Sequence, residues 1–274
     1  MNTSVRILVF DSGVGGLSIV SEIKKRIAQA DIVFAADNAG FPYGTKSEDY
    51  LVARILQVVT RMQEYCGADI IVVACNTAST VALDMLRARF EVPIVGVVPA
   101  IKPAAEQSRT GKIGLLATPA TVAGNYTRQL IADFAGHCEV RLLGSSRLVE
   151  MAEQKLRGEP VDLTEISDIL APLTDFQGMD RMVLACTHFP LLRQEIQQVM
   201  GAKVGCVDSG EAIARRVESI VARSDFGNKQ HYRKKISTKM LFTREDHLEQ
   251  FFHCSDYWPD EQSRVIEVTP VPVV

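Results

Sequence analysis

The sequence contains little that would indicate a disulfide scaffold or a metal centre. Its 274 residues include six cysteines, which form neither a C-x-x-C pair nor a dense disulfide framework, so we expect reduced thiols. His188 lies two residues from Cys186, but no second close pair supplies the other ligands of a zinc site. The sequence therefore predicts no metal. The cysteines are Cys66, Cys75, Cys138, Cys186, Cys206 and Cys254.

An excess of one charge and long apolar runs are also missing. The formal net charge is -3, from 30 basic and 33 acidic residues, which gives no field suited to binding a polyanion. The apolar stretch before Asp11 is too short for a signal peptide, and no run approaches the length of a membrane span. We expect a soluble, cytoplasmic protein that binds neither nucleic acid nor a membrane.

The common nucleotide-binding motifs are absent as well. DSGVGG at 11–16 follows an expected strand, but Ser18 stands where the dinucleotide fingerprint requires a third glycine, and no P-loop sequence occurs. The amides of this turn could hold a carboxylate or a phosphate, and the Asp11 carboxylate could hold an ammonium group. A tight turn that simply needs glycine is the other interpretation. No lysine motif typical of pyridoxal phosphate enzymes is evident, so we expect no organic cofactor.

Short apolar runs rich in β-branched residues alternate with longer amphipathic stretches along the chain. With 47% apolar residues the chain can bury a sizeable core, and the alternation predicts βαβ units. The predicted fold class is α/β, with two lobes that each contain a mostly parallel sheet flanked by helices. The expected strands cover residues 5–10, 31–36, 69–74, 93–98, 112–117, 139–144, 181–186 and 203–207.

The two halves of the sequence resemble each other. VVACNTAST at 72–80 and VLACTHFPL at 183–191 both place Ala-Cys and a polar pair where a strand ends. In addition, VFDSGVGG and LLATPATV end the first strand of each half at similar distances before Cys75 and Cys186. Two pseudo-symmetric lobes would bind a ligand in the cleft outside the carboxyl ends of their strands. Both cysteines should therefore face that cleft.

The positions of the two cysteines indicate proton transfer. Cys75 stands just before an expected helix, where free amides and the helix dipole would lower the pKa of its thiol, which could then act as a base. A buried structural cysteine is the alternative interpretation. A second thiol, Cys186, in the equivalent place of the facing lobe suits a reaction that takes a proton from one face of a carbon atom and returns one to the other.

Other uses of these cysteines fit the sequence less well. The phosphatase pattern C-x5-R is absent after both. A Cys/His hydrolase could pair Cys186 with His188, but we expect side chains two residues apart to point in different directions. A disulfide between Cys75 and Cys186 would require the lobes to bring the two sulfurs within bonding distance.

Two further segments complete the organisation of the chain. The loop DNAGFPYGTKS at 37–47 is expected on the rim of the cleft, where its backbone and the Tyr43 hydroxyl could contact a small polar ligand, although an ordinary β-turn is equally compatible. In the tail, we expect a strand at 237–243 and a helix that begins near Arg244.

Four segments together, FDSGVGG, PYGTKS, ACNTAS and ACTHFPLL, resemble the glutamate racemase family, within the wider group of aspartate and glutamate racemases. The resemblance covers nearly the whole chain in order. It implies two α/β lobes with the active site between them, formed by residues 1–97 plus 208–274 and by residues 98–207. It further implies cofactor-independent racemisation of glutamate, a homodimer, and a role in supplying D-glutamate for peptidoglycan synthesis.

The resemblance also implies roles for individual residues. Cys75 and Cys186 correspond to the two proton donors and acceptors, and Asp11 and His188 assist them. Glu153 matches an auxiliary acidic position. The residues that the resemblance implies for substrate binding are Asp11, Ser12, Tyr43, Gly44, Asn76, Thr77, Thr118, Thr121, Thr187 and His188.

Two of these matches leave alternatives open. For Glu153 and the nearby Glu150, a solvated helix face is the other interpretation. Residues 186–188 read Cys-Thr-His, as in glutamate racemases, whereas aspartate racemases look more like Cys-Thr-Glu. A charged histidine can stabilise a neighbouring thiolate, so this difference would affect the chemistry of Cys186.

The alternative functions are an aspartate or hydantoin racemase, or a non-catalytic two-lobed protein that closes on an amino acid. Such a binding protein would have no use for paired thiols.

Overall fold

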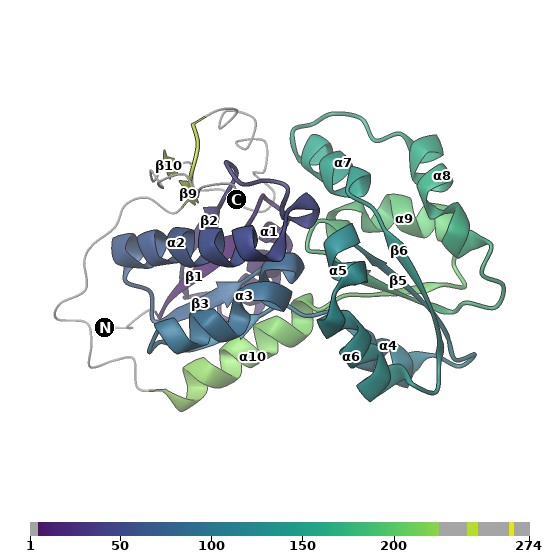
Figure 1. Cartoon of the computed structure of the whole chain (residues 1–274), viewed down its shortest axis with the longest axis horizontal. Helices are drawn as coiled ribbons and strands as arrows, with labels where there is room; N and C mark the ends of the chain where they lie inside the picture. The colour runs from purple at the N-terminus through teal and green to yellow at the C-terminus, as the bar shows by residue number, and fades with distance from the viewer. Residues whose placement is uncertain (1–4, 225–239, 246–262, 266–274) are drawn as a thin grey trace.

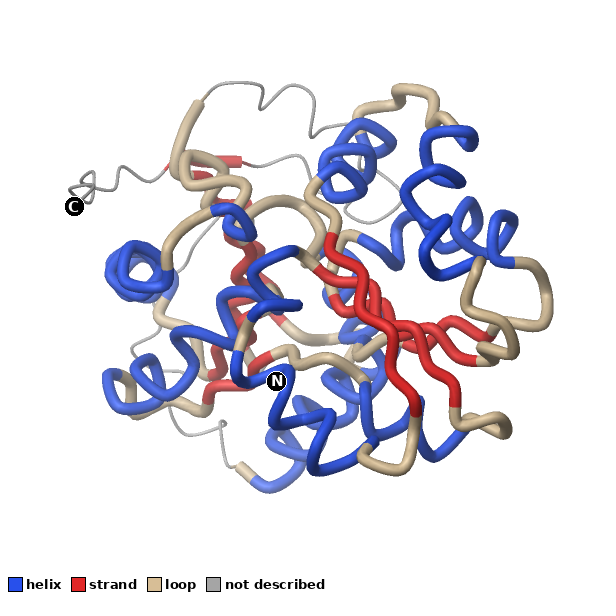
Figure 2. Tube along the Cα trace, turned by 45° about the vertical axis from the view of Figure 1, so that its right-hand side comes forward, coloured by secondary structure: helices blue, strands red, loops and turns tan. Residues whose placement is uncertain are grey.

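The chain forms two α/β halves, each built around a parallel sheet (Figure 1). The structure is a computed structural model that describes residues 5–224, 240–245 and 263–265. In Figure 2 the two sheets, coloured red, stand in separate halves of the molecule with helices around them. This arrangement confirms the predicted fold class.

The first sheet is built from strands of the N-terminal region and two strands of the tail. The strands are β1 (Arg6–Asp11), β2 (Asp31–Ala36), β3 (Ile70–Val73), β4 (Ile94–Gly96), β9 (Met240–Phe242) and β10 (Ser263–Val265). Their order is β10-β9-β2-β1-β3-β4, and every described pair is parallel. β1 and β3 are buried along their whole length, which is typical of parallel strands covered on both faces.

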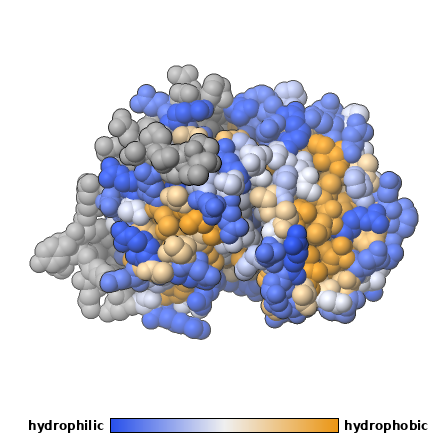
Figure 3. Space-filling view, viewed as in Figure 1, coloured by the Kyte–Doolittle hydropathy of each residue, from blue (hydrophilic) through white to orange (hydrophobic). Residues whose placement is uncertain are grey.

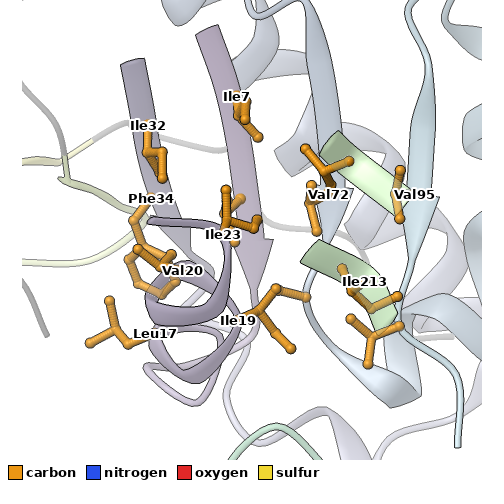
Figure 4. Close-up of a cluster of buried hydrophobic side chains, with 14 of the residues drawn as sticks. Ile7, Leu17, Ile19, Val20, Ile23, Ile32, Phe34, Val72, Val95 and Ile213 are labelled. Carbon is orange, nitrogen blue, oxygen red and sulfur yellow. The ribbon is translucent and has the colours of Figure 1, made fainter. Parts of the chain in front are cut away.

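Helices cover both faces of this sheet because successive strand residues point to opposite sides. Ile7 and Val9 belong to one core with α1 and α10, whereas Leu8 and Phe10 belong to another with α2 and α3. Figure 4 shows the first core, with Ile213 of α10 and the side chains of α1 on the same face. These helices are α1 (Leu17–Arg26), α2 (Glu48–Cys66), α3 (Asn76–Arg89) and α10 (Gly210–Arg223).

The second sheet repeats this plan on a smaller scale. Its strands are β5 (Lys112–Ala117), β6 (Glu139–Gly144), β7 (Arg181–Ala185) and β8 (Gly205–Val207), all parallel, in the order β6-β5-β7-β8. One core joins it to α4 and α6, and another to α7, α8 and α9. The helices are α4 (Ile101–Gln107), α5 (Pro119–Ala123), α6 (Asn125–Ala135), α7 (Arg147–Leu156), α8 (Leu163–Thr174) and α9 (Arg193–Met200).

The strand orders confirm the pseudo-symmetry inferred from the sequence. The order β6-β5-β7-β8 is the counterpart of β2-β1-β3-β4, so β3 and β7 occupy equivalent places. Cys75 and Cys186 follow these two strands. After the second sheet the chain returns to the first half, where α10 packs against α1. The division at residues 97/98 and 207/208 agrees with this path but stays a prediction.

In the tail, β9 lies within the strand expected at 237–243 and confirms it for Met240–Phe242, and residues 237–239 lie outside the described residues. The helix expected near Arg244 lies outside the described residues. None of the helices in the described ranges is long and apolar enough to cross a membrane. Apolar side chains gather on the surface over β5 and β6 in Figure 3, where β6 is an edge strand and only half-buried.

Candidate active site

A small polar pocket lies where the carboxyl ends of the two sheets face each other. Its cavity of about 20 Å³ has room for little more than a water molecule. An amino acid is larger than this cavity, so binding one requires some movement of the walls. The lining residues are Ser12, Pro42, Tyr43, Gly44, Cys75, Asn76, Thr77, Thr118, Ser146, Val149, Cys186, Thr187 and His188.

Cys75 forms the first wall of the pocket, at the N-cap position of α3. Its Sγ lies 3.7 Å from the Ser12 Oγ. Burial raises the pKa of the Cys75 thiol well above its ordinary value, and the Asp11 carboxylate adds to this increase. The net decrease in this pKa that the position before the helix predicted is therefore not found. The hydrogen bond from the Ala78 amide does act in the expected direction, but desolvation outweighs it.

Asp11, at the end of β1, lies behind Cys75 and has no exposed surface. Its two oxygens accept hydrogen bonds from backbone amides of the following turn and, from the other half of the molecule, from Thr187 Oγ1 at 3.1 Å. Burial raises the pKa of Asp11, and the positive charge of His188 opposes the increase. Asp11 does not line the cavity.

Cys186 faces Cys75 from the second half, and His188 lies beside it. The Cys186 Sγ and His188 Nδ1 are 3.8 Å apart. The expectation that these two side chains point in different directions is wrong. The chain leaves β7 in a turn closed by the Phe189 amide on the Cys186 carbonyl, so the alternation of a strand no longer applies at these positions.

Glu153 of α7 holds the other side of the His188 ring. Its Oε1 lies 2.8 Å from His188 Nε2, and both side chains are buried. The solvated-face interpretation is therefore wrong for Glu153, whereas it holds for Glu150, which is exposed and paired with Arg147. Burial disfavours a charged His188, but its contacts with Cys186 and Glu153 outweigh burial and raise its pKa well above the ordinary value.

The glycine-rich turn after β1 binds these groups through its backbone. The Val14 amide donates to Glu153 Oε1 at 2.8 Å, and the Gly15 amide lies 3.3 Å from His188 Nε2. A Cβ atom at Gly15 would stand 2.3 Å from His188 Nδ1, and one at Gly13 would stand 2.4 Å from Glu153 Oε1. The turn does bind carboxylates, as the sequence suggested, but they belong to the protein's own side chains, Asp11 and Glu153.

Hydroxyl groups and one amide form the remaining polar wall. Thr77 Oγ1 lies 3.1 Å from Thr118 Oγ1, which is 3.0 Å from Thr121 Oγ1. Thr118 caps α5 by accepting from the Thr121 amide, as expected for a threonine before Pro119. The Nδ2 atom of Asn76 is buried without a hydrogen-bond partner. An unpaired buried donor in a pocket wall indicates a place for an acceptor atom of a ligand.

The structure brings most of the residues named from the sequence to this pocket. Asp11, Thr121 and Glu153 lie behind its wall, and the others contribute to its lining. Pro42, which stands in the singled-out loop, and Ser146 and Val149 at the start of α7 also line the pocket. The last two carry no sequence motif. They follow β6, however, and the rule that ligands bind at the carboxyl ends of parallel strands could have indicated this segment.

The described cysteines are free, and no group of three or more His, Cys, Asp or Glu in the described ranges is arranged to hold a metal ion.

A family model for Asp/Glu/Hydantoin racemase matches residues 16–217, a span that includes both Cys75 and Cys186. The chain belongs to the Asp/Glu/Hydantoin racemase family. Membership of this family confirms the resemblance inferred from the motifs and makes the chain an isomerase of the racemase class.

Relatives and solved structures within the family agree with this assignment. A glutamate racemase from Vibrio cholerae serotype O1 is 52% identical over 229 residues, which are 83% of this chain and 85% of the relative. Escherichia coli glutamate racemase, solved with L-glutamate and the activator UDP-MurNAc-ala, has a TM-score of 0.91 and 42% identity, covering 98% of this chain and 100% of that one. A glutamate racemase isoform from Bacillus anthracis has a TM-score of 0.76 and 27% identity, with 98% of each chain covered.

Proposed function

We propose that this racemase interconverts L- and D-glutamate by moving the α-proton between Cys75 and Cys186, without a cofactor. The observation that carries the proposal is that the two thiols come from opposite halves of the molecule and line one pocket. Inversion at a carbon atom requires removal of a proton on one face and delivery on the other. Two acid–base groups on opposite walls meet that requirement.

The two cysteines have different surroundings, and we infer that these prepare them for different roles in the resting enzyme. Cys75 has a raised pKa and stays a thiol at neutral pH. Cys186 lies 3.8 Å from the ring of His188, whose pKa is raised, so this ring is placed to exchange a proton with the sulfur. The resting site is thus suited to giving a proton from Cys75. Turnover of the other enantiomer needs the opposite state.

The walls of the pocket suit a substrate with carboxylate groups. The free Asn76 Nδ2 and the N-terminal amides of α3 offer hydrogen-bond donors. Such donors would also bind the carboxylate as it gains enolate character when the proton leaves. Glutamate is favoured over aspartate or hydantoin substrates because the relatives with half of their sequence in common are glutamate racemases, and because residues 186–188 read Cys-Thr-His.

We propose the wider role from the resemblance to the glutamate racemase family. D-glutamate made in this way would serve peptidoglycan synthesis in the cytoplasm. We also propose a homodimer. The half-buried apolar side chains of β6 leave an apolar surface on the second half (Figure 3), which is the kind of surface found at protein interfaces.

The reaction is tested by circular dichroism of L-glutamate, and separately D-glutamate, incubated with the purified protein. We expect loss of the signal from either enantiomer. L-aspartate and a hydantoin serve as competing substrates, and preference for one of these would overturn the choice of glutamate. In deuterium oxide, the product enantiomer should carry solvent deuterium at Cα. A stable signal together with saturable glutamate binding would instead indicate a binding protein.

The two-thiol mechanism is tested separately by Cys75→Ala and Cys186→Ala. Each should abolish racemisation, because neither enantiomer can be both deprotonated and reprotonated by one remaining thiol. Replacement by Ser should leave only a trace, since an alcohol is a far poorer base near neutral pH. Cys66→Ala is the matched control, because Cys66 is buried in the core away from the pocket. Substantial turnover by either active-site Ala variant would refute the mechanism while leaving the reaction itself established.

A further inference from the structure

A hydrogen-bond network behind the Tyr43–Gly44 wall, buried at Asp37 and partly exposed at Thr243, connects the pocket to the tail of the chain. Asp37 follows β2 and Thr243 follows β9, and these two strands pair in parallel, with Ala36 opposite Phe242. The two residues therefore emerge side by side, at the same end of the sheet as Cys75. None of the motifs that indicate the reaction includes Asp37 or Thr243.

The Asp37 carboxylate, which has no exposed surface, accepts four hydrogen bonds. Oδ2 accepts from Tyr43 OH at 2.7 Å and from Arg54 Nε at 2.8 Å, and Oδ1 accepts from Arg54 Nη2 and Thr243 Oγ1, both at 2.6 Å. Tyr43 therefore uses its hydroxyl to hold itself to Asp37. Burial and the charge of Asp37 raise the pKa of Tyr43 well above its ordinary value, so the phenol stays protonated and continues to donate.

Thr243 and the residue after it also bind the backbone of this loop. The Thr243 Oγ1 accepts from the Ala39 amide at 3.0 Å while donating to Asp37. The side chain of Asn38 accepts from the amides of Thr243 and Arg244, each at 3.0 Å, and donates to the Arg244 carbonyl at 2.9 Å. The tail thus contributes a set of hydrogen bonds that fix the residues between β2 and the pocket wall.

The wall itself leaves little room for displacement. A Cβ atom at Gly44 would stand 2.8 Å from Thr118 Cβ, so the turn formed by η1 (Tyr43–Thr45) packs tightly against the opposite half of the molecule. A small movement of the loop would change the shape of the pocket and the directions of its donors. Any group that fixes this loop therefore prepares the pocket for substrate.

From this geometry we propose that Thr243 is a positioning residue for substrate binding, which acts through Asp37 and Tyr43 on the Tyr43–Gly44 wall. The proposal rests on the proposed function in so far as glutamate is the ligand. It gives the tail of the chain a part in the active site, although none of its described residues lines the pocket.

The test compares Thr243→Val with Thr243→Ser. Valine keeps the shape of the side chain but removes the hydroxyl, whereas serine keeps the hydroxyl. For Thr243→Val we expect KM for both enantiomers of glutamate to rise about 5- to 20-fold, with kcat within about twofold of the unmodified enzyme, because binding must then order the loop. Thr243→Ser should restore KM to within about twofold. Unchanged KM in Thr243→Val, or an equal increase in Thr243→Ser, would overturn the proposal.

Hydrogen exchange of the full chain gives a second readout that does not depend on the substrate. In Thr243→Val the amides of residues 38–45 should exchange faster, while those of α10 keep their rates. Unchanged exchange at 38–45 would overturn the proposal. If the unmodified enzyme does not racemise glutamate, the proposed function fails, and exchange alone decides whether Thr243 positions the loop.

Discussion

Replacing Glu153 by Gln removes the negative charge that holds His188 while keeping an oxygen in the same place. The contact joins two buried side chains, with 2% of the His188 and 7% of the Glu153 side chain exposed. Hydrogen bonds to charged groups contribute about 1.5–3 kcal/mol. Breaking a buried ion pair can cost more, about 3–5 kcal/mol, but His188 can lose its proton and limit the loss. We expect Glu153→Gln to lower the free energy of unfolding by about 2 kcal/mol at pH 6.

The pH dependence gives this loss a distinctive form. The pKa of His188 is raised in the folded protein, so the stability that it contributes is fully present below its unfolded pKa of about 6.5 and is lost as the pH rises through the folded pKa. The difference in stability between Glu153→Gln and the unmodified protein should therefore be largest near pH 6 and shrink at higher pH. Urea unfolding in half-unit steps from pH 6 to pH 9.5 measures this difference.

The same substitution should slow the reaction. If the charge on His188 is needed when Cys186 gains or loses a proton, a loss of about 1.5–3 kcal/mol corresponds to a fall in kcat of about 10- to 100-fold. The matched control is Glu150→Gln on the same helix, where the exposed carboxylate pairs with Arg147 and a surface ion pair contributes little. If the two variants have equal kcat and equal pH profiles of stability, Glu153 does not control the charge of His188.

Three further variants test how the site is assembled. Gly15→Ala would place a Cβ atom 2.3 Å from His188 Nδ1, so we expect a displaced ring and a kcat lower by about 10- to 100-fold. The control is Gly205→Ala, whose Cβ would make only ordinary contacts at 3.4 Å. Equal activities of the two variants would show that the position of the His188 ring is not critical. His188→Asn and Asp11→Asn should lower kcat unequally in the two directions, because His188 lies beside Cys186 and Asp11 beside Cys75. Equilibrium fixes the ratio of the two kcat/KM values, so the measurement is kcat in each direction, together with the isotope effect from α-deuterated L- and D-glutamate. Equal losses of kcat with unchanged isotope effects would indicate that both residues only bind substrate.

The sequence alone was sufficient for the fold class and for the pair of thiols. Buried parallel strands appear as short apolar runs, and the rule that ligands bind at the carboxyl ends of such strands places Cys75 and Cys186 at one cleft. The repeated Ala-Cys motif predicted the equivalence of β3 and β7, which the two strand orders confirm. These features depend on local pattern and on general rules of chain connection, so they can be read without coordinates.

The tertiary structure decided which groups touch and how strongly each is desolvated. The turn after β7 brings His188 against Cys186, and packing of α7 across the cleft buries Glu153 while Glu150 stays exposed. Burial also raises the pKa of Cys75 where the helix N-terminus alone predicted a decrease. The contact between Thr243 and Asp37 joins residues 206 positions apart. Such contacts and desolvation arise from long-range packing, and no pattern in a local window of sequence specifies them.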